Sequence, residues 1–368
     1  MQQRGIDKIL LVITGLLVVV GFFIFTSASL GLLARDGANF TSVAFNQIIF
    51  GIIGGSIALT VMSNVHYRIW RKYALYIFLI GIALTLMVFL PVIGFSHGGA
   101  TRWLSIGPFT MQPAEVLKIA FIIYLATWLS GIQKNITSLK LGTLPFFGIV
   151  AIPGVALLLQ PDTDTFLIMA TAATAMFVTA GGRWLHVIGA GLIGIMLIGA
   201  LAMSRPYIMD RLTIFLDPSR DPQGAGYQIQ QSLIAVGSGG FLGRGFGQSV
   251  QKFEYLPEPI GDSIFAVYSE EFGFIGSALL IGLFTFFTFR GYKIASHAVD
   301  LYGMLLVVGI MTLIVTQAFL NIAAMVGMAP LSGLPLPFIS HGGTALLSVL
   351  AAVGIVLNVS KYQRKIVS

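Results

Sequence analysis

Residues 9–25 read ILLVITGLLVVVGFFIF, an apolar run without a charged side chain. A helix needs roughly 20 mostly apolar residues to cross the ~30 Å hydrocarbon core of a bilayer. With its flanking residues this run is long enough to cross. It is too long for the core of a signal peptide, and it lacks a small-residue cleavage site. We therefore expect a retained membrane helix near the start of the chain.

The composition of the whole chain agrees with this expectation. Of its 368 residues, 56% are hydrophobic and only 10% are charged, and the mean hydropathy is +0.91. Because a soluble domain carries about 25% charged residues, the composition indicates an integral membrane protein. The chain has no cysteine, which excludes disulfides and thiolate metal sites.

Apolar runs recur along the full length of the sequence. They predict one all-α polytopic transmembrane domain over residues 1–368, with ten transmembrane helices and both termini in the cytoplasm. The expected spans are 9–31, 44–63, 73–94, 112–130, 143–159, 165–181, 185–203, 263–289, 302–327 and 341–360.

The distribution of charge supports this orientation. The predicted cytoplasmic segments hold 13 of the 21 Lys and Arg residues, whereas 12 of the 14 Asp and Glu residues fall on the outer side or in outer helix ends. Short cytoplasmic loops of membrane proteins are enriched in Lys and Arg. The net charge of +7 therefore reflects topology rather than nucleic-acid binding.

One connection, residues 204–262 between the seventh and eighth expected spans, is far longer than the others. Loops of this length are usually functional or disordered, and the amphipathic stretch GYQIQQSLIAVGSGGFLG (226–243) argues against disorder. We expect a re-entrant or interfacial helix there. Irregular backbone at membrane depth is tolerated where protein buries it or a wet cavity borders it, so the sequence predicts a cavity open to the outside.

The stretch PEPIGDSIFAVYSEE (257–271) places Asp262, Glu270 and Glu271 at the start of the eighth span. Asp262 is either an ordinary N-cap of that helix or a functional group. Glu270 and Glu271 follow about 12 Å further along the helix and point about 100° apart. At least one of them therefore needs protein, water or a basic partner, for which the candidates are Arg102, Lys118 and Arg211.

The fourth span opens with QPAEVLK (112–118), which places Glu115 and Lys118 on one helix face. They form either a self-neutralising pair or a charged lining of the outer cavity, with Lys118 facing an anionic head group. Further polar clusters on the outer side are 98–109, 160–164, 210–228 and 333–343.

Known metal and nucleotide motifs are absent, since neither HExxH nor GxxxxGK[ST] occurs. The run GSGGFLGRGFG (237–247) superficially resembles a phosphate loop, but no strand–loop–helix pattern surrounds it, and we interpret it as a glycine-rich re-entrant turn. The five histidines are dispersed, and we expect none of them to be a ligand.

Four stretches together resemble the SEDS family, the shape, elongation, division and sporulation proteins FtsW, RodA and SpoVE. They are GATRWLSIGPFTMQPAEVLKIA (99–120), QPD (160–162), the series from RLTIFLDP to FEYLPE (211–258) and GLPLPFISHGG (333–343). The resemblance runs from the first span to the last. The segment GQSVQKFEYLPE (247–258) is more similar to FtsW than to RodA.

This resemblance implies ten transmembrane helices and a peptidoglycan glycosyltransferase. Such an enzyme polymerises lipid II at the outer face of the bacterial cytoplasmic membrane, for cell division or cell elongation, together with a class B penicillin-binding transpeptidase. The family's essential aspartate matches Asp262, and a divalent cation, Mg²⁺ or Mn²⁺, is expected near it. Positions typical of the family's cavity are occupied here by Arg102, Glu115, Lys118, Asp162, Arg211, Asp217, Lys252, Glu258 and Ser340.

The implied chemistry gives these residues roles. Asp262 would be the general base on the acceptor 4-hydroxyl, in a single inverting displacement. Lys118, Arg102 and Arg211 are the candidates to stabilise the departing undecaprenyl pyrophosphate. Glu270 and Glu271 would have a supporting role. The alternatives are a lipid II flippase, which would need charged residues in both halves of the bundle, and a non-catalytic scaffold for a class B penicillin-binding protein.

The sequence departs from the family pattern at three places. Many relatives read LPE-x-H-x-D-F where this chain has LPEPIGDS, so a histidine and an aromatic residue are missing before and after Asp262. QPDLGT has become QPDTDT, which adds Asp164, and SYGG has become SHGG, which brings in His341. Asp262 itself is retained, so the departures concern its surroundings.

Overall fold

The computed structural model of the protein describes residues 5–35, 37–91, 93–97, 100–106, 109–189, 191, 194, 199, 206–221 and 224–363. Within this part of the chain, eight helices are long and apolar enough to cross a membrane, and α7 (Thr163–Thr179) is a shorter apolar helix. The chain is therefore a multi-pass membrane protein. The expected span at 185–203 falls mostly outside the described residues.

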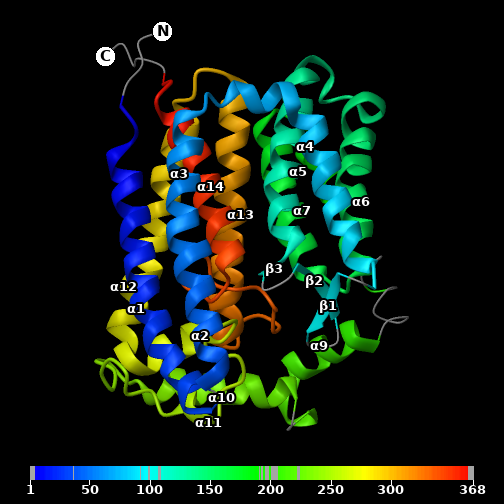
Figure 1. Ribbon diagram of the computed structural model, residues 1–368. Helices are drawn as coiled ribbons and strands as arrows, with labels where there is room; N and C mark the ends of the chain where they lie inside the picture. Colours follow the sequence, from blue (N-terminus) through cyan, green and yellow to red (C-terminus); the bar gives the residue numbers. More distant parts are fainter. Residues whose placement is uncertain are drawn as a thin grey trace.

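The spanning helices form one bundle (Figure 1). Nine of the ten expected spans correspond to described helical segments, and the second and fifth of them include a π-helical stretch, η1 (Asn46–Gly54) and η4 (Leu139–Thr143). The helices are α1 (Lys8–Arg35), α2 (Gly37–Phe45), α3 (Gly55–Asn64), α4 (Arg68–Leu86), α5 (Pro113–Gly131), α6 (Leu144–Leu159), α7, α12 (Ile264–Ser296), α13 (Leu301–Met325) and α14 (Gly343–Ser360).

The long connection before α12 is folded. It contains α9 (Pro206–Leu216), α10 (Ala225–Ser238) and α11 (Gln251–Glu254), which lie together at one end of the bundle (Figure 1). The helix expected within 226–243 corresponds to α10. Residues 206–262 are called the outer segment below.

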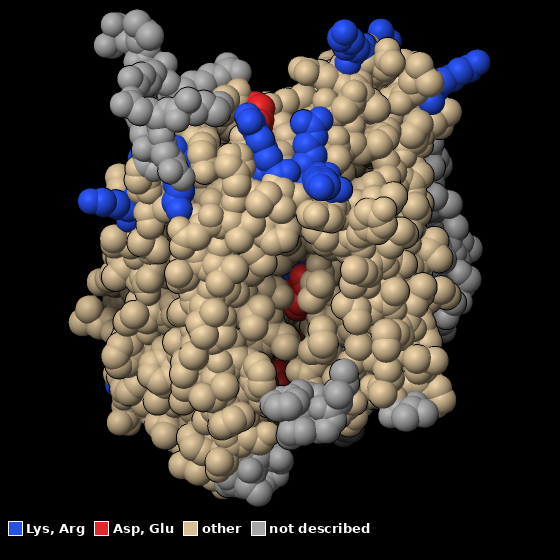
Figure 2. All heavy atoms as spheres, turned by 45° about the horizontal axis from the view of Figure 1, so that its top comes forward, with Lys and Arg blue, Asp and Glu red and all other residues tan. Residues whose placement is uncertain are grey.

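The two ends of the chain meet at the opposite end of the bundle. The backbone N–H of Asp7 donates to Ser360 Oγ at 2.9 Å, which joins the start of α1 to the end of α14. Lys and Arg side chains gather at this end (Figure 2). The bundle therefore has a basic end, which carries both chain ends, and an end covered by the outer segment.

The described part of the chain is mostly helical, as the sequence predicted, and it adds one small antiparallel sheet that the expected all-α fold did not include. Strands β1 (Gly94–His97), β2 (Ala100–Ile106) and β3 (Phe109–Met111) pair in the order β1-β2-β3 between α4 and α5. Short runs that contain β-branched and aromatic residues, separated by glycines, are typical of hairpins. The sheet lies near the outer segment (Figure 1).

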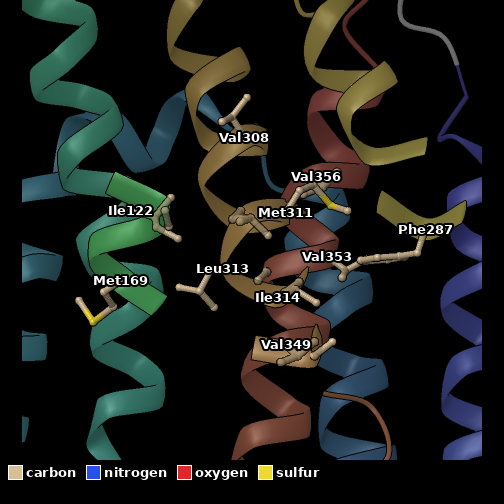
Figure 3. Close-up of a cluster of buried hydrophobic side chains, with 14 of the residues drawn as sticks. Ile122, Met169, Phe287, Val308, Met311, Leu313, Ile314, Val349, Val353 and Val356 are labelled. Atoms are coloured by element: carbon tan, nitrogen blue, oxygen red, sulfur yellow. The ribbon is translucent and has the colours of Figure 1, made fainter. Parts of the chain in front are cut away.

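The core of the bundle is centred on α13, which packs between α5 and α7 on one side and α12 and α14 on the other. Figure 3 shows its buried side chains Met311, Leu313 and Ile314 among Ile122 of α5, Met169 of α7 and Val353 of α14. Toward its carboxyl end the same helix buries Gln317 and Asn321. Because buried amides need hydrogen-bond partners, these two residues indicate a polar region there.

Candidate active site

Asp262 lies in a tight turn directly before α12. The N-cap position of α12 is Ser263, so the interpretation of Asp262 as the helix cap is wrong. The turn is closed by the Ser263 N–H, which donates to the Glu258 carbonyl at 3.2 Å. From α13, the Asn321 side-chain amide donates to the Asp262 carbonyl at 2.8 Å and to the Leu334 carbonyl at 2.8 Å. The backbone of Asp262 is therefore fixed against α13, while its carboxyl group makes no capping bond.

The charged groups around Asp262 are mixed in sign. The pKa of Asp262 is raised to about 7, by burial first and then by the negative charges of Glu258 and Asp164, against the opposing effects of Arg102 and Arg211. A carboxyl group with a pKa near neutrality is suited to general acid–base chemistry at physiological pH. Asp262 also retains an exposed edge, through which a substrate hydroxyl can reach it.

Arg102 reaches the site from strand β2. Its guanidinium donates to the backbone carbonyls of Gln160 (3.4 Å) and Pro161, and Nη1 lies 3.9 Å from Asp162 Oδ1. Two carbonyls anchor the group without neutralising it, because they carry no net charge. Arg102 therefore supplies positive charge beside the turn that precedes α7.

Arg211 reaches the same region from α9. It pairs with Asp164 at 2.7 Å, and the Asp164 carboxylate also accepts the Gly333 N–H at 3.2 Å. The backbone at Gly333 passes close to both groups, since a β-carbon there would lie in van der Waals contact with them, 3.6 Å from Arg102 Nη1 and 3.8 Å from Asp262 Oδ2. One residue from each of the four polar clusters named in the sequence analysis thus lies near Asp262, namely Arg102, Asp164, Arg211 and Gly333.

Asp162 caps α7, since its side chain accepts the Thr165 N–H at 3.4 Å. Its second oxygen, Oδ2, is buried and has no hydrogen-bond partner. Burial raises the pKa of Asp162. A buried acceptor without a partner is uncommon in folded proteins, so this carboxyl group is held in place for a reason beyond capping.

Glu115 and Lys118 are both buried and form an ion pair of 2.8 Å. Lys118 Nζ also donates to Gln317 Oε1 at 2.9 Å, and the Gln317 amide donates to the Pro335 carbonyl at 2.8 Å. This chain of contacts ties α5 through α13 to the loop before α14. The geometry favours the self-neutralising pair over the charged cavity lining, which leaves Lys118 as a support rather than a free cation.

Of the other predicted residues, Ser340 lies next to Asp262, whereas Lys252 and Asp217 pair with other side chains. Ser340 Oγ donates to the Gly261 carbonyl at 2.7 Å and accepts the Leu336 N–H at 2.8 Å, so it holds the backbone next to Asp262. Lys252, by contrast, is fully buried in the outer segment, where it pairs with Glu271 at 2.7 Å. Asp217 pairs with Arg220 at 3.4 Å on an exposed surface.

The two glutamates of α12 do not pair with any of the three basic residues expected from the sequence. Glu270 accepts the Ser249 hydroxyl at 2.6 Å and lies 3.5 Å from Arg244, and Glu271 binds Lys252. The prediction that Arg102, Lys118 or Arg211 pairs with these glutamates is therefore wrong. The supporting role expected for Glu270 and Glu271 agrees with this arrangement.

With this geometry in view, comparison with known proteins gives the family. The model of the FtsW, RodA and SpoVE family, described as "Cell cycle protein", matches residues 7–365. The chain belongs to this family. It is 42% identical to stage V sporulation protein E of Bacillus subtilis over 363 residues, which is 99% of each chain. It is 38% identical over 357 residues to a protein of Trichlorobacter lovleyi named probable peptidoglycan glycosyltransferase FtsW, covering 96% and 93% of the two chains.

Solved structures of the FtsW, RodA and SpoVE family share the fold. A chain of a peptidoglycan synthase complex that coordinates polymerization and crosslinking aligns with a TM-score of 0.79 at 25% identity, covering 96% of this chain and 97% of that one. The rod shape determining protein RodA of Thermus thermophilus aligns with a TM-score of 0.70 at 24% identity, covering 98% of each chain.

Three residues of this family member were not predicted as site residues. Asp164 holds Arg211 and the Gly333 N–H, Asn321 holds the Asp262 carbonyl, and Gln317 holds Lys118. Gln317 and Asn321 are four residues apart in an otherwise apolar helix, so they share one helix face. That spacing was the signal available in the sequence.

The expected divalent cation finds no ready-made set of ligands. Among the described residues no group of three or more His, Asp or Glu side chains is placed to hold a metal ion. Arg102 and Arg211 also bring positive charge to Asp262. These residues therefore do not fit a divalent cation held by the protein alone.

Proposed function

We propose that this chain polymerises lipid II into β-1,4-linked glycan strands, with undecaprenyl pyrophosphate as the leaving group. Membership of a family with relatives named peptidoglycan glycosyltransferase supports this activity. The observation that carries it is the position of the Asp262 carboxyl group, whose pKa is about 7, near the positively charged guanidinium groups of Arg102 and Arg211.

In the proposed reaction, the Asp262 carboxylate takes the proton of the acceptor 4-hydroxyl while that oxygen attacks the anomeric carbon of the donor sugar. The bond from this carbon to the pyrophosphate oxygen breaks, and the electron pair leaves with the pyrophosphate. A single displacement of this kind inverts an α-linked donor to a β-linked product. One base on the face opposite the leaving group is sufficient for it.

Arg102 and Arg211 are the candidates to stabilise the leaving pyrophosphate. Their side chains retain exposures of 18% and 30%, and a guanidinium fork matches phosphate oxygens well. Arg211 would exchange its pairing with Asp164 for the pyrophosphate. Lys118, at 2% exposure and paired with Glu115, supports the loop before α14 instead.

The proposed topology places the site on the outer side of the cytoplasmic membrane. Lys and Arg side chains gather at the end of the bundle (Figure 2) where Asp7 contacts Ser360, and an excess of Lys and Arg marks the cytoplasmic side. The complete arrangement would have ten spans with both termini inside. Figure 2 also shows Asp and Glu atoms at the bottom of a hollow in the side of the bundle, which would admit a head group whose tail stays in lipid.

The proposed partner is a class B penicillin-binding transpeptidase. The alignment with a chain of a complex that coordinates polymerization and crosslinking supports a crosslinking partner. Relatives named SpoVE and FtsW are both similar to this chain, and the proposed process is glycan synthesis for cell division or elongation. The divalent cation stays a prediction, which a comparison of polymer yield with Mg²⁺, with Mn²⁺ and with a chelator would test.

The decisive experiment is Asp262→Asn in protein purified with its transpeptidase partner and supplied with labelled lipid II. Loss of a general base is expected to reduce the polymerisation rate by about 10²–10⁴. Asp300→Asn is the matched control, because Asp300 caps α13 at the opposite end of the bundle and asparagine also caps helices well. Undiminished polymer from Asp262→Asn would contradict the mechanism. Head-group translocation without polymer in the wild type would favour the flippase.

A further inference from the structure

Helix α12 is broken at Gly273, where φ is 65° and ψ is −163°. In an uninterrupted α-helix the N–H groups of Phe274 and Ile275 would donate to the carbonyls of residues 270 and 271. Here the Phe274 N–H donates to the Gly240 carbonyl at 2.8 Å and the Ile275 N–H to the Phe241 carbonyl at 3.2 Å. Two donors that the break sets free are therefore taken up by the outer segment.

The two carbonyls freed by the break are taken up in the same way. The Glu270 carbonyl accepts the Arg244 N–H at 3.0 Å, and the Glu271 carbonyl accepts the Gly245 N–H at 2.9 Å. Residues 240–245 thus replace both missing helical hydrogen bonds with four bonds of their own. Because lipid offers no partners for free backbone groups, a break in a spanning helix requires such a substitute.

The close approach explains part of the glycine-rich sequence of this loop. A β-carbon at position 243 would lie 2.1 Å from the Glu271 carbonyl oxygen, and one at position 239 would lie 2.1 Å from the Ser269 carbonyl oxygen. Gly243 also has a positive φ of 81°. The run first noted as a re-entrant turn is therefore shaped to fit the break in α12.

Side chains fasten the same two parts together. Glu271 accepts hydrogen bonds from Lys252 Nζ at 2.7 Å and from the Ser27 hydroxyl of α1 at 2.6 Å. Glu270 accepts bonds from Ser249 Oγ (2.6 Å), the Val250 N–H (3.2 Å) and the Gln251 N–H (3.3 Å). Lys252, Glu270 and Glu271 are all buried. In a buried environment such fully paired charges fix geometry strongly.

We infer that the half-helix Ile264–Phe272 moves as one unit with residues 239–252 of the outer segment, and that Lys252 and Glu271 are positioning residues that set the placement of Asp262. The inference rests on the proposed function. The half-helix begins two residues after Asp262 and is separated from the rest of α12 by the break. Its position is set by the outer segment and, through the Asp262 carbonyl, by Asn321. Two hydrogen bonds also cross the break: the Tyr268 hydroxyl donates to the Gly276 carbonyl at 2.9 Å and the Ser277 hydroxyl to Ser269 Oγ at 2.9 Å.

The test is the pH dependence of polymerisation by Lys252→Met and by Glu271→Gln, each purified with the transpeptidase partner and supplied with labelled lipid II. The charged groups that face Asp262 are Glu258, Asp164, Arg102 and Arg211, and neither substitution removes one of them. A loosened half-helix admits water to Asp262, so the midpoint of the acid limb should fall by about half a unit or more. The kcat should fall by about tenfold or more, with a smaller change in KM.

Asp7→Asn is the matched control, because it breaks the 2.7 Å ion pair between Asp7 and Arg290 near the other end of the same helix. It should lower the Tm and leave the midpoint of the pH profile unchanged. If Lys252→Met does not fold, Ser27→Ala removes the hydroxyl that donates to the Glu271 carboxylate and accepts from Lys252 Nζ at 3.0 Å, and it should shift the midpoint in the same direction.

Wild-type midpoints in Glu271→Gln and Ser27→Ala would overturn the inference, even if less folded protein is recovered. A wild type that makes no polymer under any condition would instead contradict the proposed function. The two failures are therefore distinguishable.

Discussion

Two acidic groups flank the first half of α12 and are treated in opposite ways. At the buried end, Glu270 and Glu271 meet a lysine, hydroxyl groups and backbone N–H groups. At the outer end, Asp262 faces two further carboxylates and is left with a pKa of about 7. The first half of α12 therefore carries two paired carboxylates and directly follows a third carboxyl group whose pKa is raised, and the third one lies where chemistry is proposed.

The difference shows how stability and reactivity are divided between neighbouring residues. Paired buried charges fix a structure, whereas a carboxyl group with a raised pKa destabilises the folded state once it ionises. Perturbed carboxyl groups of this kind cluster at functional sites. Substitutions in the Lys252–Glu271 pair and at Asp262 test this difference.

The largest expected effect is on the stability of the paired end. Glu271→Leu leaves the Lys252 ammonium, which is fully buried, without its carboxylate, and such a loss costs about 3–5 kcal/mol. The double variant Lys252→Met/Glu271→Leu should recover most of this loss, because two apolar side chains often replace a buried ion pair without penalty. Thermal unfolding in detergent measures both. A double variant no better than the single one would show that the pair is not the unit that matters.

At Asp262, by contrast, removal of the charge is expected to stabilise the folded protein. Its folded pKa of about 7 exceeds the usual value of about 3.9, so the folded state loses stability as the pH rises from about 4 to about 7. Asp262→Asn escapes this loss and should be more stable than the wild type at pH 8, by at most about 4 kcal/mol. The gain should shrink at pH 5.

Asp300 offers the matched comparison for this measurement. Its pKa is lowered by the Gly303 N–H, Tyr67 and Arg68, against the effect of burial. Asp300→Asn should therefore lose stability relative to the wild type at pH 8, where Asp262→Asn gains it. Thermal unfolding at two pH values tests both signs, and equal shifts in the two variants would refute the contrast.

The rate of polymerisation should follow the ionised fraction of Asp262. With a pKa of about 7, roughly a tenth of the carboxyl groups are ionised at pH 6, so the rate should be about tenfold lower than at pH 8. Initial rates with labelled lipid II across this range provide the measurement. A rate independent of pH between 6 and 8 would be inconsistent with Asp262 as the base.

The smallest effects are expected from the charges around Asp262. Asp164→Asn removes a charge that raises the pKa of Asp262, and Arg211→Gln removes one that lowers it. The acid limb of the pH profile should therefore move down in the first variant and up in the second. Shifts in the same direction would mean that the substitutions act by disturbing the pair that these two residues form.

The membrane helices were predictable because their signal is local. Runs of apolar residues such as 9–25 and 302–327 are long enough to identify α1 and α13 without knowledge of their neighbours. The approximate position of α10 was predictable for the same reason, from its amphipathic pattern. The sheet at 94–111 was missed because its strands are short and because polar and apolar residues do not alternate regularly along them.

The site was predictable only in part. Asp262 was identified by resemblance, whereas its partner Asn321 was missed although it lies one turn from a second amide, Gln317, in a mostly apolar helix. The pairing of Glu271 with Lys252 was not predictable, because it depends on how the outer segment folds back onto α12. The break at Gly273 was equally hidden, since the stretch EEFGFIGS (270–277) differs from an ordinary helix only by its glycines.

The break in α12 also bears on the order of assembly. Residues 240–245 precede α12 in the chain, so they are synthesised before Gly273. The residues whose backbone groups bond to those freed by the break are therefore made before the break itself. A permuted chain in which the outer segment followed α12 would expose four unbonded backbone groups to lipid during insertion, and the natural chain order avoids that intermediate.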